Sequence, residues 1–331
     1  MEKTRNPYFD VLRGTIIIMV VGIHTFNDGL SLSGGAACLA GAAREAFNCV
    51  VPLFLAISGF FVGRKPVERR ADRWAFWRRQ LPRVYVPYLL WAMPHFVLAL
   101  AGGRSWLLSL ALLLCCGYGV FYFVALILQY YLLLPLIRRH NTRRGLAVAA
   151  VVTVAATGLV GYVTMVRGIG LPLLFSGGLT PEWWLYFALG VYLGTHRRDY
   201  APRPLLLAAL LFFAADVAET LWLNGLHDGG GFGVKLSSVG YATAVVLFLF
   251  SRRVEEAVRR RAAWLRGLAW LGRLSYGIYL AHVPCLMLLR RFVALPSWLA
   301  EWAAALALTC LVLAALRALL PQRLHRWLAL V

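Results

Sequence analysis

The chain has 331 residues, of which 61% are hydrophobic and 15% are charged, and its formal net charge is +20 at pH 7. Soluble domains contain about 45–50% apolar residues, so this composition excludes an ordinary soluble protein and indicates a polytopic membrane protein. The cations lie in loops that flank apolar segments, and no zinc-finger or RNA-binding signature accompanies them, so we expect no nucleic-acid partner. We expect these loops to contact anionic membrane lipids instead.

Apolar segments long enough, or nearly long enough, to cross a hydrocarbon core of about 30 Å recur along the whole chain. The ten expected spans are residues 11–30, 47–63, 84–101, 118–137, 146–166, 182–195, 204–223, 236–250, 272–291 and 299–320. The sixth and eighth are short, and we interpret them as tilted or broken helices that the bundle covers. No connection is long enough for a soluble core, so residues 1–331 are predicted to form a single all-α integral-membrane domain.

The distribution of arginine and lysine predicts the orientation in the membrane. If the N-terminus is cytoplasmic, the outer connections hold only Arg44, Arg104, Arg167 and Lys235, whereas the inner connections are rich in arginine. This asymmetry places both termini in the cytoplasm. The apolar stretch at 106–116 would reverse every later loop if it crossed the membrane, so we interpret it as a short outer-surface or re-entrant helix.

Two ionisable side chains, Arg13 and His24, lie within the first apolar segment, VLRGTIIIMVVGIHTF. An arginine at the centre of a membrane helix costs about 2.5–3.5 kcal/mol on insertion scales, so such residues indicate function. The spacing is about three helical turns, which puts both side chains on one stripe, roughly 16 Å apart along the axis. We expect Asp10 to pair with Arg13, and Asp28, one turn after His24, to hold one tautomer of that imidazole.

Two later segments carry further candidate groups. In VVPLFLAISGFFVG, Pro52 is expected to bend or break the second span. In the same segment Ser58 is expected to pack or to form hydrogen bonds, because no hydrolase elbow identifies it as a nucleophile. In LGRLSYGIYLAHVP, Tyr279 and His282 are three residues apart and share a helix face. The six cysteines lack metal-ligand spacing, so we expect no metal site.

Taken in order, these motifs resemble a known family. The run YFDVLRGTIIIMVVGIHTF is similar to the opening signature of the membrane-bound acyltransferase family 3, in which an Arg is followed after ten residues by a His, as in Arg13 and His24. PLFLAISGFF resembles the second-helix motif, FWRRQLPRVYVPYLLW the basic loop and third helix, FYFVALILQYYLLLPLI the central aromatic span, and LSYGIYLAHVP the late signature. The resemblance is to the bare membrane domain of the family's O-acetyltransferase type.

The resemblance implies that the protein moves an acetyl or similar acyl group from cytoplasmic acyl-CoA to a hydroxyl of a carbohydrate, often a lipid-linked or cell-surface glycan. It implies that His24 is the base or the transient acyl acceptor, and that Arg13 binds the donor or polarises the acyl group. Arg78, Arg79 and Arg83 match the family's basic loop and are expected to pair with the phosphates of acetyl-CoA or another acyl-CoA. It also implies a location in the bacterial cytoplasmic (inner) membrane.

Two other classes of function stay open at this stage. A secondary transporter or flippase would also use intramembrane ionisable groups, and its main acidic candidates are Asp216 and Glu219. In a non-catalytic lipid-binding or assembly subunit, the charged residues of the first span would be structural. Thioester hydrolysis by the purified protein separates the enzyme from both. For the enzyme, His227 and Asp228 in an outer loop are candidate contacts to the acceptor.

Overall fold

The computed structural model describes residues 6–26, 35–224, 233–261 and 264–330. In these parts of the chain the structure consists of helices joined by short connections, and it contains no strand. The predicted all-α fold is therefore confirmed for the described residues.

The chain divides into two compact units, and each is assembled from segments that are distant in sequence. The first unit comprises residues 1–31, 78–128 and 262–331, and the second comprises residues 32–77 and 129–261. Two helices run across the division, α4 (Arg70–Ala101) and α6 (Tyr122–Arg139). The assignment of the whole chain to a single domain stays a prediction.

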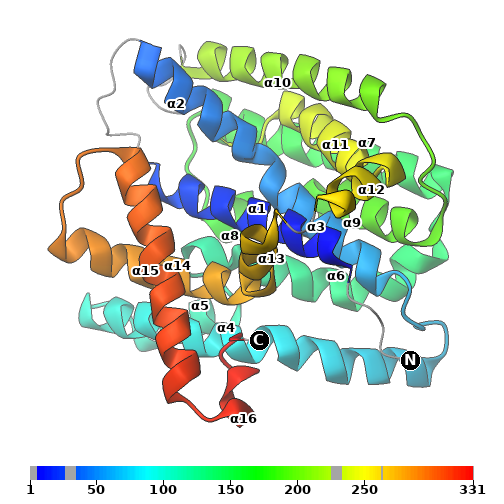
Figure 1. Cartoon of the computed structure of the whole chain (residues 1–331). Helices are drawn as coiled ribbons and strands as arrows, with labels where there is room; N and C mark the ends of the chain where they lie inside the picture. The colour runs from blue at the N-terminus through cyan, green and yellow to red at the C-terminus, as the bar shows by residue number, and fades with distance from the viewer. Residues whose placement is uncertain (1–5, 27–34, 225–232, 262–263, 331) are drawn as a thin grey trace. The chain divides into compact units, whose positions relative to one another are not determined.

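The other helices of the first unit come from both ends of the chain and from its first half (Figure 1). They are α1 (Pro7–Thr25), α5 (Trp106–Leu114), the 3₁₀ turn η2 (Gly119–Phe121), α13 (Arg266–Arg273), α14 (Ser275–Phe292), α15 (Trp298–Leu319) and α16 (Gln322–His325).

The other helices of the second unit follow one another in the middle of the chain. They are α2 (Gly35–Ala46), the 3₁₀ turn η1 (Phe47–Cys49), α3 (Val50–Val62), α7 (Arg143–Gly161), the π-helical turn η3 (Tyr162–Val166), α8 (Leu173–Ser176), α9 (Thr180–Thr195), α10 (Pro202–Asn224), α11 (Leu236–Phe250) and α12 (Arg252–Arg260).

Seven helical segments among the described residues are long and apolar enough to cross a membrane. They are Pro7–Thr25, Leu39–Val62, Arg70–Ala101, Gly119–Arg139, Arg143–Val166, Pro202–Asn224 and Trp298–Leu319. The remaining three expected spans are also helical, as α9, α11 and α14, but α9 has only 16 residues and α11 only 15. The count of ten spans and the cytoplasmic position of the termini stay predictions.

The stretch at 106–116 forms a helix too short to span a membrane. Helix α5 has nine residues, which at 1.5 Å per residue is roughly 14 Å, about half of the hydrocarbon core. Tyr85 and Tyr88 of α4 donate hydrogen bonds from their hydroxyls to the carbonyls of Leu114 and Leu113, at 2.8 and 2.6 Å. The C-terminal end of α5 is therefore held against α4. The expected short helix is confirmed, and its outer-surface or re-entrant position stays a prediction.

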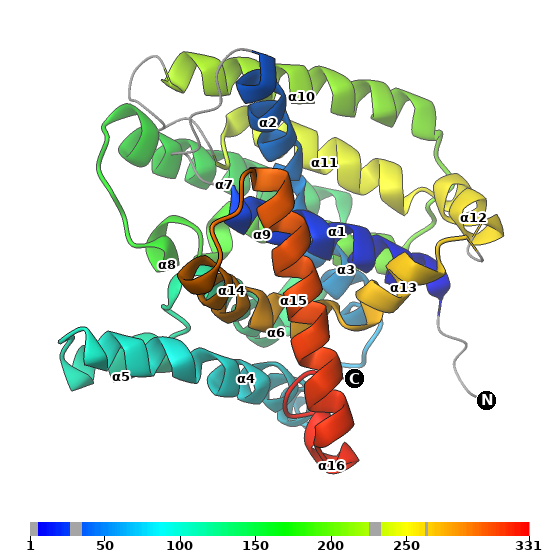
Figure 2. The ribbon, with the colours of Figure 1, turned by 60° about the vertical axis from the view of Figure 1, so that its left-hand side comes forward.

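Helix α1 is held closely on two sides within the first unit. A Cβ atom on Gly14 would lie 1.9 Å from the carbonyl oxygen of Leu268, so the backbones of α1 and α13 meet where only glycine fits. On another side α15 crosses α1 (Figure 2). There the indole N–H groups of Trp298 and Trp302 donate to backbone carbonyls of α1, at 3.1 and 2.8 Å. These contacts fix the helix that carries both signature residues.

In the second unit, α3 and α9 approach each other through glycines in the same way. A Cβ on Gly59 would lie 2.4 Å from the carbonyl oxygen of Phe187, and a Cβ on Gly190 would lie 2.2 Å from that of Ala56. The second apolar segment is interrupted by the turn η1, and Pro52 lies in the first turn of α3, where its missing N–H costs no helical hydrogen bond. The helical segment Leu39–Val62 therefore continues through Pro52, and the expected bend at this proline stays a prediction.

Candidate active site

The start of α1 determines where Arg13 lies. The side-chain oxygen of Asn6 accepts a hydrogen bond from the Tyr8 amide at 3.1 Å, and Pro7 occupies the first helical turn, so the helix is capped at its first residue. Two turns on, Nη1 of Arg13 lies 3.2 Å from Oδ1 of Asp10. The predicted ion pair is confirmed. The Asp10 side chain is 4% exposed and that of Arg13 is 26% exposed, so the pair lies at the edge of the packed interior.

His24, near the end of α1, lies against His282 of α14. Their ring centroids are 5.1 Å apart, and the ring planes are inclined by 38°. His24 comes from the opening motif and His282 from the late motif, and the fold of the first unit brings the two together. The sequence placed His282 on a face shared with Tyr279 but gave no indication of this contact.

The hydrogen bonds of His282 define its tautomer. Its Nδ1 lies 2.7 Å from the carbonyl oxygen of Tyr279 and 3.2 Å from that of Ile278. Carbonyl oxygens only accept, so we infer that Nδ1 carries the proton and that Nε2 is a hydrogen-bond acceptor. The side chain is fully buried, and Nε2 has no hydrogen-bond partner among the described residues. A buried acceptor without a partner next to His24 is the most distinctive polar feature of this unit.

Tyr279 and Tyr276 anchor the helix on which His282 lies. The Tyr279 hydroxyl donates to the carbonyl of Val120 at 2.7 Å, and the Tyr276 hydroxyl donates to that of Val84 at 2.5 Å. The ring of Tyr279 has its centroid 6.0 Å from that of His282. Because its proton is engaged with a backbone carbonyl, Tyr279 acts in this structure as a positioning residue for α14.

Sequence reasoning missed one further imidazole in the first unit, His95 of α4. Its Nδ1 is buried and has no hydrogen-bond partner in the described parts of the chain. Its ring packs edge-on against Phe121 at 5.3 Å between centroids, and Phe121 in turn packs against Tyr279 at 6.3 Å. The only sequence signal was a lone histidine in the apolar run WAMPHFVL.

Ser58 belongs to the second unit and is not part of the histidine pair. Its hydroxyl shares a hydrogen bond of 3.2 Å with the hydroxyl of Tyr131, and the indole N–H of Trp77 donates to the Tyr131 carbonyl at 2.9 Å. Within the described residues no imidazole or carboxylate contacts the Ser58 hydroxyl. The hydrogen-bonding role that we expected for Ser58 agrees with this environment.

The three arginines expected at the acyl-CoA phosphates lie on one helix. Arg78, Arg79 and Arg83 are all exposed on α4, and the described residues provide none of them with an ion-pair partner. Their role stays a prediction. The expected contact from Asp28 to His24 lies outside the described residues, as do the candidate acceptor contacts at 227 and 228. No group of metal-ligating side chains occurs in the described ranges.

Asp216, one of the two acidic candidates for a transporter, belongs to a buried ion cluster of the second unit. The Lys235 ammonium contacts Oε2 of Glu45 and lies 3.1 Å from Oδ1 of Asp216, and all three side chains are at most 1% exposed. Glu219 accepts hydrogen bonds from the amide and the hydroxyl of Ser237. Lys235, which the sequence placed in an outer loop, is therefore buried, because two carboxylates offset its charge.

Comparison with known proteins gives one match. The model of the acyltransferase 3 family, described as an acyltransferase domain, matches residues 6–318. No curated protein and no solved structure matches the chain. The matched range contains Arg13, His24 and His282, together with all the helices from α1 to α14.

Proposed function

Because this chain belongs to the acyltransferase 3 family, we propose that it is a membrane O-acyltransferase that uses acyl-CoA, in the first instance acetyl-CoA, as donor. The proposed acceptor is a hydroxyl of a carbohydrate or of a lipid-linked or cell-surface glycan, and the proposed location is the bacterial inner membrane. The observation that supports this function best is the contact between His24 and the buried His282. His24 lies on the same helix as Arg13, and His282 belongs to the same unit.

Acyl transfer from a thioester requires a base at the attacking hydroxyl. In the proposed reaction His24 removes the hydroxyl proton while the oxygen bonds to the acyl carbon, the carbon–sulfur bond breaks, and the proton passes to the leaving thiolate. General-base assistance of this kind contributes about 10²–10⁴-fold to the rate. In the alternative sequence a ring nitrogen of His24 bonds to the acyl carbon while the carbon–sulfur bond breaks and CoA leaves as the thiolate. The hydroxyl oxygen then bonds to the acyl carbon as the carbon–nitrogen bond breaks, and the hydroxyl proton passes to the thiolate.

We assign His282 a positioning role for His24. Its Nδ1–H is held by backbone carbonyls, so its Nε2 lone pair is available at the ring that faces His24. An acceptor beside a histidine base orients the ring and stabilises the charged form that arises when the base takes a proton. The contact between the two rings supports a pair of imidazoles in this proposal. The expected contact from Asp28 to His24 stays a prediction.

Arg13 is the proposed electrophilic partner. Its planar guanidinium offers five N–H donors, and the ion pair with Asp10 orients the group through Nη1. In this role it binds the donor or stabilises the negative charge that develops on the acyl oxygen. The exposed arginines of α4, Arg78, Arg79 and Arg83, are the proposed contacts to the phosphates of CoA.

The function is tested with detergent-purified wild type and single variants, by binding of radiolabelled acetyl-CoA and by release of free CoA thiol. We expect His24→Ala to bind acetyl-CoA but to lose at least 10²-fold in CoA release. His282→Ala should lower kcat more than it raises KM for acetyl-CoA, because it acts through His24. His140→Ala, at an exposed histidine of the second unit, is the matched control and should match wild type.

The same experiment can refute the proposal. If His24→Ala releases CoA at the wild-type rate, His24 is not the base. If wild type binds no acyl-CoA and instead exchanges solute in liposomes, the protein is a transporter. Incubation with labelled acetyl-CoA in the absence of acceptor separates the two sequences of steps, because label on His24 identifies it as the transient acyl acceptor.

A further inference from the structure

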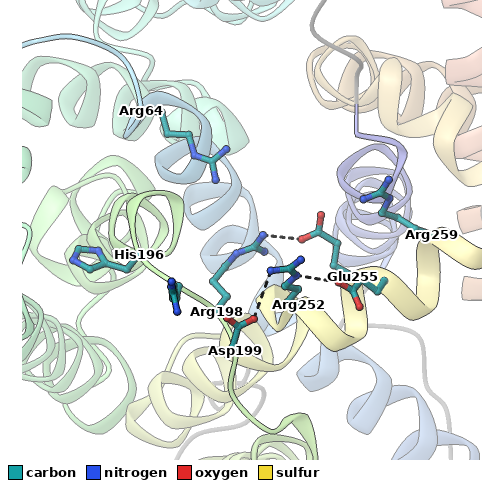
Figure 3. A pocket seen from close by; sticks show the side chains of 9 residues that line it. Arg64, His196, Arg198, Asp199, Arg252, Glu255 and Arg259 are labelled. Atoms are coloured by element: carbon teal, nitrogen blue, oxygen red, sulfur yellow. Dashed lines mark hydrogen bonds and ion pairs between the residues drawn. The ribbon is translucent and has the colours of Figure 1, made fainter.

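The second unit contains a cavity of about 520 Å³ whose walls are mainly arginine and carboxylate side chains (Figure 3). The residues come from the connection after α3, from the connection after α9, and from the polar helix α12. They comprise five arginines, three carboxylates and one histidine, so the walls carry two more cations than anions. All nine lining residues belong to the second unit. The histidine pair and the three arginines proposed for CoA belong to the first unit.

The carboxylates of this cavity hold two of its arginines in place. Nη2 of Arg198 lies 2.8 Å from Oε2 of Glu255, and Nε of Arg252 lies 3.0 Å from Oε1 of Glu256. Arg252 also lies 3.9 Å from Asp199, and the hydrogen bond that Arg252 donates to Glu256 raises the pKa of Arg252 above its ordinary value. Each carboxylate is thus matched by an arginine before any ligand binds.

The other three arginines are not neutralised by these carboxylates. Arg64 is fixed, because its Nε donates to the carbonyl of Gly194 and its guanidinium lies 4.6 Å from the ring centroid of Phe60. Its terminal nitrogens keep their donors toward the cavity. For Arg197 and Arg259, the described residues provide no ion-pair or hydrogen-bond partner, and both side chains are exposed.

We propose that this pocket binds a phosphate-bearing anion, either the head group of an anionic lipid or the phosphates of a soluble nucleotide. Planar guanidinium groups bind phosphate oxygens through paired hydrogen bonds, and an excess of two positive charges matches a phosphomonoester or diphosphate. The volume lies within the range of about 300–1,000 Å³ that is typical of small-molecule sites. The site does not depend on the proposed acyl transfer.

A purely topological role for these cations predicts a different arrangement. Arginines that only orient a membrane protein need no fixed geometry and no buried partner. Here Glu255 is buried, and it holds Arg198 in the wall, while the Arg198 Nη1 also donates to the carbonyl of Phe250 at 3.0 Å. The cavity therefore has preorganised walls, which is a property of a binding site.

The test compares the variant Arg197→Gln/Arg259→Gln with Arg143→Gln/Arg144→Gln. The second pair removes the same charge from exposed positions at the start of α7, outside the cavity. One arm measures binding of adenosine 5′-diphosphate to protein in neutral detergent by calorimetry. The other arm measures the phosphatidic acid, a phosphomonoester lipid, that protein retains from nanodiscs of phosphatidylcholine with phosphatidic acid, by native mass spectrometry.

We expect the cavity variant to lose binding by tenfold or more in at least one arm, because each charge-assisted hydrogen bond contributes strongly. The control pair should stay within about twofold of wild type. Loss in the nucleotide arm identifies a soluble ligand, and loss in the lipid arm identifies a lipid head group. Unchanged binding in both arms, or equal loss in the control pair, overturns the proposal. Among the described residues neither Arg197 nor Arg259 has an ion-pair or hydrogen-bond partner, so we expect the cavity variant to fold.

Discussion

Replacement of Lys235 by methionine should strongly destabilise the second unit. The Lys235 side chain is 1% exposed, and its ammonium is shared by the carboxylates of Glu45 and Asp216, which are 1% and 0% exposed. Methionine keeps most of the length and removes the charge. Removal of one partner from a buried ion pair costs about 3–5 kcal/mol, because the remaining charge is left uncompensated. Here two carboxylates lose their cation.

The hydrogen bonds that remain do not replace this charge. Asn48 Nδ2 donates to Glu45 at 2.8 Å and to Asp216 at 3.1 Å, and the Ser238 hydroxyl donates to Asp216 at 2.6 Å. These donors are neutral. The expected loss of about 3–5 kcal/mol is therefore large beside the 5–15 kcal/mol of a typical fold, and it changes the folded-to-unfolded ratio by roughly two to four orders of magnitude.

The assay is unfolding by sodium dodecyl sulfate in mixed micelles, followed by circular dichroism, and the matched control is Lys65→Met. Lys65 has no side-chain ion pair or hydrogen bond in the described parts of the chain, so its replacement should be nearly neutral. Lys235→Met/Glu45→Gln should be less destabilised than the sum of its single variants, because the charge left by the first change is removed by the second. If the free energies of unfolding of Lys235→Met and Lys65→Met differ by less than about 1 kcal/mol, the stabilising role of the cluster is refuted.

Three further predictions concern packing, pH and the donor site. Gly272→Ala should destabilise the protein by at least the roughly 1–3 kcal/mol typical of overpacking, because its Cβ would lie 1.7 Å from a carbonyl oxygen of α1. Gly267→Ala on the same helix is the control and should leave the stability unchanged, because no atom lies within 4 Å of its Cβ. A hydrogen bond from Arg138 lowers the pKa of Glu68 below its ordinary value of 4.5. The ionised Glu68 therefore makes a small contribution to stability that is complete above pH 4.5 and is lost as pH falls through the lowered pKa. In Glu68→Gln this contribution should disappear from the pH profile of the free energy of unfolding. Arg13→Lys should keep the fold by circular dichroism but lose at least tenfold in CoA release, because an ammonium lacks the planar fork.

The sequence predicted features that depend on local spacing. Apolar runs placed a helix at each expected span, because a membrane segment must satisfy its backbone hydrogen bonds internally. The pair between Asp10 and Arg13 followed from a three-residue spacing, which any helix brings onto one face. The family resemblance rested on motifs in order, and the matched family confirms it.

Features that depend on tertiary contacts could not be predicted. Nothing in the opening and late motifs indicates that the rings of His24 and His282 meet, because their distance depends on how α1 and α14 pack. Lys235 was assigned to an outer loop because a count of charges per loop cannot show which charges form ion pairs. Its two carboxylate partners, Glu45 and Asp216, lie on the distant helices α2 and α10. The arginine cavity was missed for the same reason, since its walls come from two separate connections and from helix α12.

The histidine pair and the lysine cluster differ in what a proton would do to them. The ammonium of Lys235 lies between two carboxylates, so a change in protonation there breaks an ion pair that holds helices together. In the histidine pair, two imidazoles are in contact, and protonation of both rings is opposed by repulsion between like charges. A pair that alternates between neutral and singly protonated forms suits a reaction in which one proton leaves a hydroxyl and then reaches a thiolate. The histidine pair of the first unit is therefore the group that we propose for proton transfer, whereas we expect the buried charges of the lysine cluster to stabilise the second unit.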